Sequence, residues 1–347
     1  MASHDASLAT VPGFRLKLIL ALAAVYVVWG STYLAIRYAI ETLPPFSMAG
    51  VRFLIAGGLL YGWARLRGTP RPAAVHWRSA AIVGGLLLLG GNGIVVWAEQ
   101  FVDSGLTALL VSTTPLWMVL LHWLFQGGTR PGPRMIAGLV VGFLGVALLA
   151  RPGSGQVAPL AALLLVFASF CWAGGSIYSR RAPLPASPLL GTGMEMICGG
   201  ALLMVAGLIA GEPWSFDPAA VTAASLGGFV YLIVFGSLVG FTAYIWLLKA
   251  APPALASTYA YVNPMVAVFL GWAFAGEPVT GQTLLSGAVI VAGVALISTA
   301  SARQTAAEKA AAGAKAAEPA PPMPVDKEPP RLARRAAEEP EPALAER

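Results

Sequence analysis

Two charged residues lie inside long apolar runs, Arg52 in the run 46–65 and Glu195 in the run 187–209. A guanidinium ion at the centre of a bilayer costs about 2.5–3.5 kcal/mol on insertion scales. Arg52 is therefore expected to face the interior of a helix bundle or a wet cavity. There it could hold a carboxylate or another anionic group of a substrate. The alternative is a structural arginine that bonds to broken-helix carbonyls or reaches toward the outer surface.

Glu195 is the one acidic residue inside an apolar run. Desolvation favours the neutral form of a carboxyl group, so Glu195 could carry a proton or act as the counter-charge of an amine. The alternative is a neutral acid that is hydrogen-bonded between helices. The rise of a helix places Glu195 and Arg52 about 10 Å apart along the membrane normal, which argues against a direct ion pair.

Aromatic and amide side chains recur at the middle of the neighbouring apolar runs. We expect six of them to line a substrate site together with Arg52 and Glu195, and the alternative for each is ordinary packing or a place at the membrane interface. The six residues are Trp29, Asn92, Trp97, Trp172, Tyr244 and Tyr261.

Two prolines, Pro115 and Pro264, lie inside apolar runs at matched positions. A proline within a helix frees a backbone carbonyl and bends the helix. Freed carbonyls at membrane depth are tolerated where they line a cavity or find a partner. Both prolines are therefore candidate hinges, and the alternative is a kink that only helps packing.

The composition predicts an integral membrane protein that consists of helices. Of the 347 residues, 57% are hydrophobic and 11% are charged, whereas a soluble domain has roughly 25% charged residues. The apolar runs have the length of spanning helices, about 20 residues. They cover approximately 17–37, 46–65, 79–98, 104–125, 134–150, 158–178, 187–209, 221–247, 254–275 and 281–300.

Several function classes find no support in the sequence. The two cysteines, Cys171 and Cys198, lie in apolar runs, and the three histidines have no metal-ligand spacing. No metal, no other cofactor and no catalytic motif is therefore expected, which argues against an enzyme. The formal charge of +6 does not predict nucleic-acid binding, because the basic residues lie in short loops between apolar runs.

The sequence contains an internal repeat. Trp29, Gly50 and Gly57 match Trp172, Gly193 and Gly200, and the stretch Trp97–Pro115 matches Trp246–Pro264. Five runs in each half reverse the second half in the membrane, and inverted repeats are typical of transporters with a site at the midplane. The alternative is a duplication that only stabilises a bundle. The predicted domains are 16–150 and 157–300, followed by a disordered cytoplasmic tail, 301–347, rich in alanine, proline and charge.

Basic residues concentrate in the loops on one side of the predicted bundle. The positive-inside rule then places both termini in the cytoplasm. The apolar run that follows Lys17 is too long for the core of a cleaved signal peptide, so we expect it to stay as the first span.

The hairpin VVWGSTYLAIRYAIETLPPFSMAGVRFLIAGGLL, the matched prolines, and the turn Gly276-Glu277-Pro278 followed by Gly287 and GVALIS resemble EamA-type members of the drug/metabolite transporter superfamily. The hairpin is most similar to that of YedA-like exporters. The resemblance covers roughly 16–300. It implies ten transmembrane helices in two inverted five-helix repeats, and a central cavity among helices one, three, four, six, eight and nine. Glu277 matches the acid of the family's Gly-Glu turn, where the first repeat has Gly127-Gly128, and its expected role is structural.

The resemblance implies a secondary-active, multi-pass transporter of the plasma (inner) membrane that exports small metabolites by alternating access. Amino acids or amphipathic drugs are the expected solutes, and protons are the candidate coupling ion. An uncoupled facilitator is the nearest alternative. A non-transporting sensor or scaffold and a lipid-acting membrane enzyme are the others.

Overall fold

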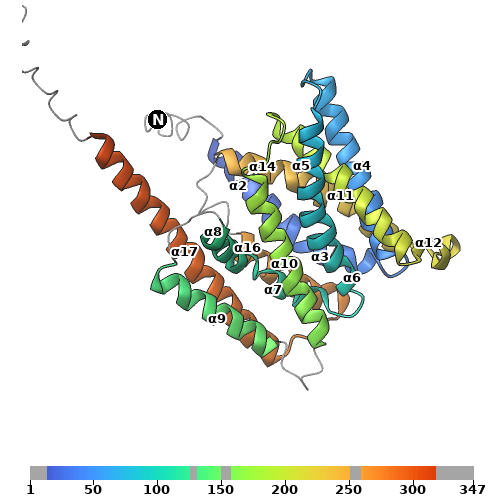
Figure 1. The fold of residues 1–347 in the computed structure, drawn as a ribbon. Coiled ribbons are helices and arrows are strands. Elements are labelled where there is room, and N and C mark those ends of the chain that lie inside the picture. The colour runs from blue at the N-terminus through green and yellow to red at the C-terminus, as the bar shows by residue number, and fades with distance from the viewer. Residues whose placement is uncertain (1–13, 126–130, 150–157, 251–258, 318–347) are drawn as a thin grey trace, which may run out of the picture. The chain divides into compact units, whose positions relative to one another are not determined.

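The computed structural model describes residues 14–125, 131–149, 158–250 and 259–317, and all regular structure in these ranges is helical (Figure 1). The first half of the chain contains α2 (Phe14–Ala24), η1 (Val25–Trp29), α3 (Gly30–Ala39), α4 (Pro45–Leu66), α5 (Ala74–Gly84), η2 (Gly85–Gly93), α6 (Ile94–Ala98), α7 (Ser104–Val111), α8 (Thr114–Phe125) and α9 (Pro133–Leu149). The second half contains α10 (Pro159–Ser179), α11 (Pro188–Ile209), α12 (Glu212–Ser215), η3 (Pro218–Ala220), α13 (Ala223–Tyr231), η4 (Leu232–Val239), α14 (Gly240–Ala250), α16 (Tyr259–Ala275) and α17 (Gly281–Ala317).

The chain divides into two compact units, residues 1–303 and 304–347. The helix bundle and the site belong to the first unit. α17 continues as a helix to Ala317, beyond the point where the sequence predicted a disordered tail to begin. The alanine-rich segment after Arg303 accounts for this, since alanine has the highest helix propensity. The remaining tail, 318–347, lies outside the described residues.

Eight helical stretches in the described ranges are long and apolar enough to cross a membrane. Two further apolar helices, Pro133–Leu149 and Val262–Ala275, are shorter. Their positions agree with the predicted runs, and the total of ten spans stays a prediction. The run 104–125 is broken, because α7 ends at Val111 and α8 begins at Thr114.

Matched glycines form the contact between α4 and α11, which lie side by side in Figure 1. A Cβ atom added to Gly57 would lie 2.8 Å from the carbonyl oxygen of Gly193, and one added to Gly50 would lie 3.0 Å from that of Gly200. Since Gly50 corresponds to Gly193 and Gly57 to Gly200 in the repeat, each half contributes the same pair of positions to the contact. Such reciprocity is the property of a two-fold interface. Small residues allow membrane helices to approach this closely.

The two matched helices run in opposite directions. Glu212 follows the end of α11, and its carboxylate accepts hydrogen bonds from the backbone N–H of Phe46 (2.8 Å) and Ser47 (2.7 Å) in the first turn of α4. The end of α11 therefore lies at the beginning of α4. This pair supports inversion of the two repeats, and the inversion of the complete five-helix units stays a prediction.

A second Gly-Glu-Pro turn repeats this arrangement at α7. The carboxylate of Glu277 accepts hydrogen bonds from the backbone N–H of Ser104 (2.8 Å) and Gly105 (3.0 Å). Gly276 and Gly211, which precede the two glutamates, have φ values of +64° and +80°, and glycine adopts this conformation without steric cost. Both carboxylates thus occupy the positive end of a helix dipole.

Replacement of Gly57 by alanine is expected to destabilise the protein by about 1–3 kcal/mol, because the added methyl group has no room against α11. Gly58 provides the matched control, since nothing lies within 4 Å of a Cβ atom added there. Gly58→Ala is expected to leave stability unchanged or raise it by up to about 1 kcal/mol through helix propensity. Thermal unfolding in detergent measures both, and equal effects would contradict the close contact.

Candidate functional site

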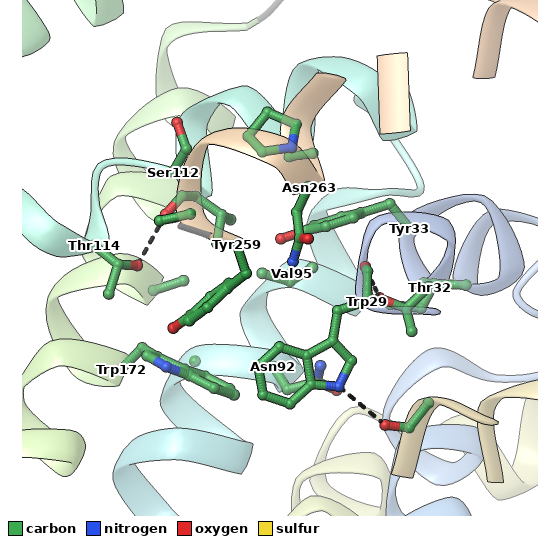
Figure 2. Close-up of a pocket in the computed structure, with 18 of the residues that line it drawn as sticks. Trp29, Thr32, Tyr33, Asn92, Val95, Ser112, Thr114, Trp172, Tyr259 and Asn263 are labelled. Atoms are coloured by element: carbon green, nitrogen blue, oxygen red, sulfur yellow. Dashed lines mark hydrogen bonds between the residues drawn. The ribbon is translucent and has the colours of Figure 1, made fainter. Parts of the chain in front are cut away.

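A cavity of about 180 Å³ lies within the bundle (Figure 2). Its walls come from both halves of the chain and are mostly apolar or aromatic, with a few polar groups. The lining residues include Trp29, Thr32, Tyr33, Ile36, Arg52, Phe53, Gly91, Asn92, Val95, Ser112, Thr114, Pro115, Trp172, Gly236, Phe241, Tyr259, Asn263 and Pro264.

Arg52 places its guanidinium group at the wall of this cavity, and the residue is only 3% exposed. Its Nε donates a hydrogen bond to the hydroxyl of Ser237 at 2.9 Å, and its Cζ lies 4.6 Å from the ring centroid of Phe53. Its Nη1 is buried and has no hydrogen-bond partner in the described structure. An unmade hydrogen bond of a buried charge is costly, and Arg52 therefore retains a hydrogen-bond donor that the described protein groups do not use.

An aromatic cluster forms one wall. The Trp29 indole donates a hydrogen bond to the carbonyl oxygen of Gly236 at 3.2 Å, drawn as a dashed line in Figure 2. Its ring meets Tyr259 edge-on with centroids 5.4 Å apart. Tyr244 packs behind both, 5.0 Å from Trp29 and 5.6 Å from Tyr259. The cluster fixes the orientation of the two rings that face the cavity.

Trp172 enters the cavity from α10. A Cβ atom added to Gly91 would lie 3.0 Å from the Trp172 ring, so the absence of a side chain at Gly91 gives the indole its place. In Figure 2, Trp172, Tyr259 and Asn92 point toward the same space. The side-chain oxygen of Asn92 is buried without a partner in the described structure, and it provides an acceptor near the aromatic rings.

Three helical segments with π geometry contribute to the lining, namely η1 with Trp29, η2 with Gly91 and Asn92, and η4 with Gly236. The wider turn of a π-helix displaces side chains from their regular positions, and such segments are frequent at functional sites. η2 and η4 lie in corresponding helices of the two repeats. The sequence showed only glycine-rich apolar runs at these places, so the π geometry was not predicted.

The helix break next to Pro115 exposes polar backbone to the cavity. Because proline has no N–H, the carbonyl of Val111 loses its helical partner. The hydroxyls of Thr114 (2.8 Å) and Ser169 (3.2 Å) donate hydrogen bonds to this carbonyl instead. Pro264 differs, since it lies inside the continuous helix α16. Both prolines line the cavity, and their role as hinges stays a prediction.

The predicted site residues differ in their relation to the cavity. Arg52, Trp29, Asn92 and Trp172 line the cavity together with the two prolines. Tyr244 packs behind the wall, and the side chain of Tyr261 lies outside the described part of the chain. Whether any of these residues binds a solute stays a prediction.

Glu195 and Trp97 lie away from this cavity. The backbone of Glu195 packs against Gly84 of α5, so the residue belongs to the contact between α11 and α5. Trp97 lines a second, surface pocket together with Gln100, Glu41 and Glu212. Spacing in the sequence predicted a depth for both residues but could not determine which face of the helix they occupy.

Glu99 belongs to a polar cluster with Arg37, Asp103 and Glu277 that was not predicted from the sequence. Glu99 is 3% exposed, and both of its carboxylate oxygens lack a hydrogen-bond partner in the described structure. Burial raises its pKa well above the usual range, the charge of Glu277 adds to this, and Arg37 opposes it. The pKa of Asp103 is raised by the same causes. Glu99 directly follows the apolar run 79–98, and a residue in this position is expected to be a solvated loop acid.

Thr114→Val and Ser169→Ala are expected to act non-additively on stability. Each hydroxyl can serve the Val111 carbonyl without the other, so each single replacement should cost less than about 1 kcal/mol. The double variant leaves a buried acceptor unsatisfied and should cost about 1–3 kcal/mol. A double-mutant cycle by thermal unfolding measures the coupling, and simply additive effects would contradict the shared acceptor.

Comparison with known proteins agrees with this architecture. The model of the EamA-like transporter family matches residues 16–151 and 159–299. The uncharacterized inner membrane transporter YedA of Escherichia coli K12 is 42% identical over 264 residues, which cover 75% of this chain and 83% of that protein. Protein PecM of Dickeya dadantii is 28% identical over 74% of this chain and 84% of its own length.

A solved crystal structure matches with a TM-score of 0.57 at 20% identity, over 83% of this chain and 98% of the other. At that identity the likeness concerns the fold alone. The family match covers most of the chain, and the family and YedA are transporters rather than enzymes. The chain therefore belongs to the EamA-like transporter family and is a multi-pass inner-membrane transporter.

Proposed function

We propose that this transporter exports small metabolites with a carboxylate group, with amino acids as the best candidates. The observation that supports this most strongly is Arg52, which lines the cavity and whose buried Nη1 has no partner in the described structure. A charge-assisted hydrogen bond from this nitrogen to a carboxylate would satisfy it. The solute would thereby provide the partner that the described protein groups do not.

The other cavity groups fit the rest of an amino acid. The unpartnered side-chain oxygen of Asn92 can accept a hydrogen bond from an ammonium group. The rings of Trp29, Tyr259 and Trp172 offer apolar and aromatic surface to a side chain. The volume of about 180 Å³ is below the roughly 300–1,000 Å³ of pockets for drug-sized ligands, which favours amino acids over amphipathic drugs.

The repeat supports transport by alternating access. Two halves with opposite orientation can switch between two equivalent packings around a site that lies between them. The close α4–α11 contact is a suitable pivot, since it contains the same glycines from each half. Pro115 and Pro264 are the positions where we place the bending of the cavity helices. An uncoupled facilitator would use the same cavity, and uphill flux in a pH gradient separates it from a proton antiporter.

The orientation in the membrane follows from charge. We define the acidic end of the bundle as the end that contains Glu41, Glu99, Asp103, Glu212 and Glu277. The opposite loops contain Arg65, Arg67, Arg71, Arg78, Arg180 and Arg181. The positive-inside rule then places the acidic end outside and both termini in the cytoplasm.

Arg52→Gln is expected to lower the flux of labelled amino acids into proteoliposomes about 10- to 100-fold. The reason is the loss of a hydrogen bond to a charged group, about 1.5–3 kcal/mol. Amine analogues that lack the carboxylate serve as the control, and their flux should change little. If Arg52→Gln transports every member of an amino acid panel normally, the proposed carboxylate site is wrong.

Glu195→Gln is expected to leave the apparent affinity for the same solutes unchanged, because Glu195 does not line the cavity. The KM of the transported amino acid measures this in the proteoliposome assay. A large rise of KM in Glu195→Gln, with KM preserved in Arg52→Gln, would instead assign solute binding to Glu195.

A further inference from the structure

We propose that Glu99 is a proton-binding site that controls the opening of the acidic end of the bundle. The proposal rests on the proposed transport function, because Glu99 would bind and release a proton during the transport cycle. It is argued from the position of Glu99, from its missing partners and from the way in which Arg37 and Glu277 are engaged.

Glu99 is the acid of this end that lies one helical turn from the cavity lining. Its backbone N–H donates a hydrogen bond to the carbonyl of Val95 at 3.0 Å, one turn earlier. Val95 and Ile36 line the cavity, and Ile36 directly precedes Arg37. The side chains of Arg37 and Asp103 are 35% and 29% exposed, whereas Glu99 is buried. A proton or a solute that passes between cavity and acidic surface would therefore pass near this cluster.

Arg37 is the one cation near Glu99 among the described residues, and it already interacts with two other carboxylates. Its Nη1 atom lies 3.4 Å from an oxygen of Asp103, and its Nε lies 3.6 Å from an oxygen of Glu277. Glu277 also caps the first turn of α7. With Glu99 neutral, two carboxylates share one guanidinium group. With Glu99 ionised, three carboxylates compete for it, and repulsion of Glu277 weakens the α3, α7 and α16 contacts that close the end.

The groups that act on Glu99 come from two elements. They are Arg37 and Tyr33 of α3 and Glu277 after α16, and Asp103 before α7 interacts in turn with Arg37 and Glu277. α10, which also packs on α6, contains no charged residue.

α4 also packs on α6, and its Arg52 is engaged with Ser237. Arg37 is therefore the one cation in this described set that acts on Glu99. Ser104 and Thr107 at the start of α7 add two buried hydroxyls without partners in the described structure. In the closed arrangement, no described group other than Arg37 is positioned to stabilise a negative charge on Glu99.

The direction of the pH effect follows from linkage. The closed arrangement raises the pKa of Glu99, whereas exposure to water would return it to about 4.3. The closed arrangement therefore binds the proton more tightly and is favoured at low pH. Between about 4.3 and the raised pKa, each pH unit favours the open arrangement by up to about tenfold, and above the raised pKa no further shift occurs. Protonation forms one O–H bond on the carboxyl, and deprotonation returns that proton to water.

The experiment measures the accessibility of the acidic end without any solute. The full chain in detergent, with Cys171 and Cys198 replaced by alanine, receives one reporter, Val102→Cys. Val102 is buried in the segment between Glu99 and Asp103, and its neighbour Phe101 is exposed. The labelling rate of Val102→Cys by a maleimide is divided by that of Phe101→Cys, which cancels the pH dependence of the thiol reaction itself.

The ratio is expected to rise as the pH increases above the range in which a solvated carboxyl group titrates, in the otherwise native chain. Glu99→Gln should keep the ratio low and flat, Glu99→Met is a second variant that cannot titrate, and Glu99→Asp should restore the rise. Asp217→Asn, an exposed acid of the same end, should leave the profile unchanged.

A rise that persists in both Glu99→Gln and Glu99→Met would overturn the proposal, as would a flat profile in the native chain. A ratio that depends on the sodium concentration at constant pH would indicate that Glu99 binds a metal cation instead of a proton. This outcome would also overturn the proposal. Because no solute is present, these outcomes are independent of the amino acid flux assay. Failure of the flux assay alone would leave the proton site intact.

Discussion

The need of Arg52 for polar surroundings inside a membrane helix is the constraint on which the rest of the structure depends. The cost of its charge in hydrocarbon requires partners within the bundle. The described bundle provides one acceptor, the hydroxyl of Ser237, and one aromatic ring, that of Phe53, and it leaves the buried Nη1 of this cavity-lining residue without a partner. Because Nη1 has no partner among the described protein groups, Arg52 retains a hydrogen-bond donor for a solute. An arginine with all of its donors bonded to the protein would not.

The cavity exists because the backbone around it departs from regular helix. The π segments η1, η2 and η4 and the break at Ser112 widen the walls, while hydroxyl groups satisfy the carbonyl freed next to Pro115. Outside this zone the helices are in close contact through glycines. Rigid contacts at α4–α11 next to irregular backbone at the cavity are the combination expected of a protein whose helices move as groups.

The sequence was sufficient to predict a membrane protein, its family and the approximate bounds of its helices. Composition and hydropathy indicate directly which segments lie in lipid. It also marked Arg52, Trp29, Asn92 and Trp172, since charged and amphipathic residues at mid-span are costly unless they border polar surroundings. It did not separate these from Glu195 and Trp97, because depth follows from position along a helix whereas the facing direction depends on tertiary packing. Glu99 was missed for a related reason, since a loop acid is expected to be solvated until the packing of α3, α7 and α16 is known.

The most direct test of the central claim is a structure of the protein in lipid nanodiscs, determined by electron cryomicroscopy with a transported amino acid at saturating concentration. The account predicts solute density in the cavity, with the carboxylate about 3 Å from Nη1 of Arg52. Density for the solute elsewhere, with Nη1 of Arg52 bonded to a backbone carbonyl of the protein, would contradict it.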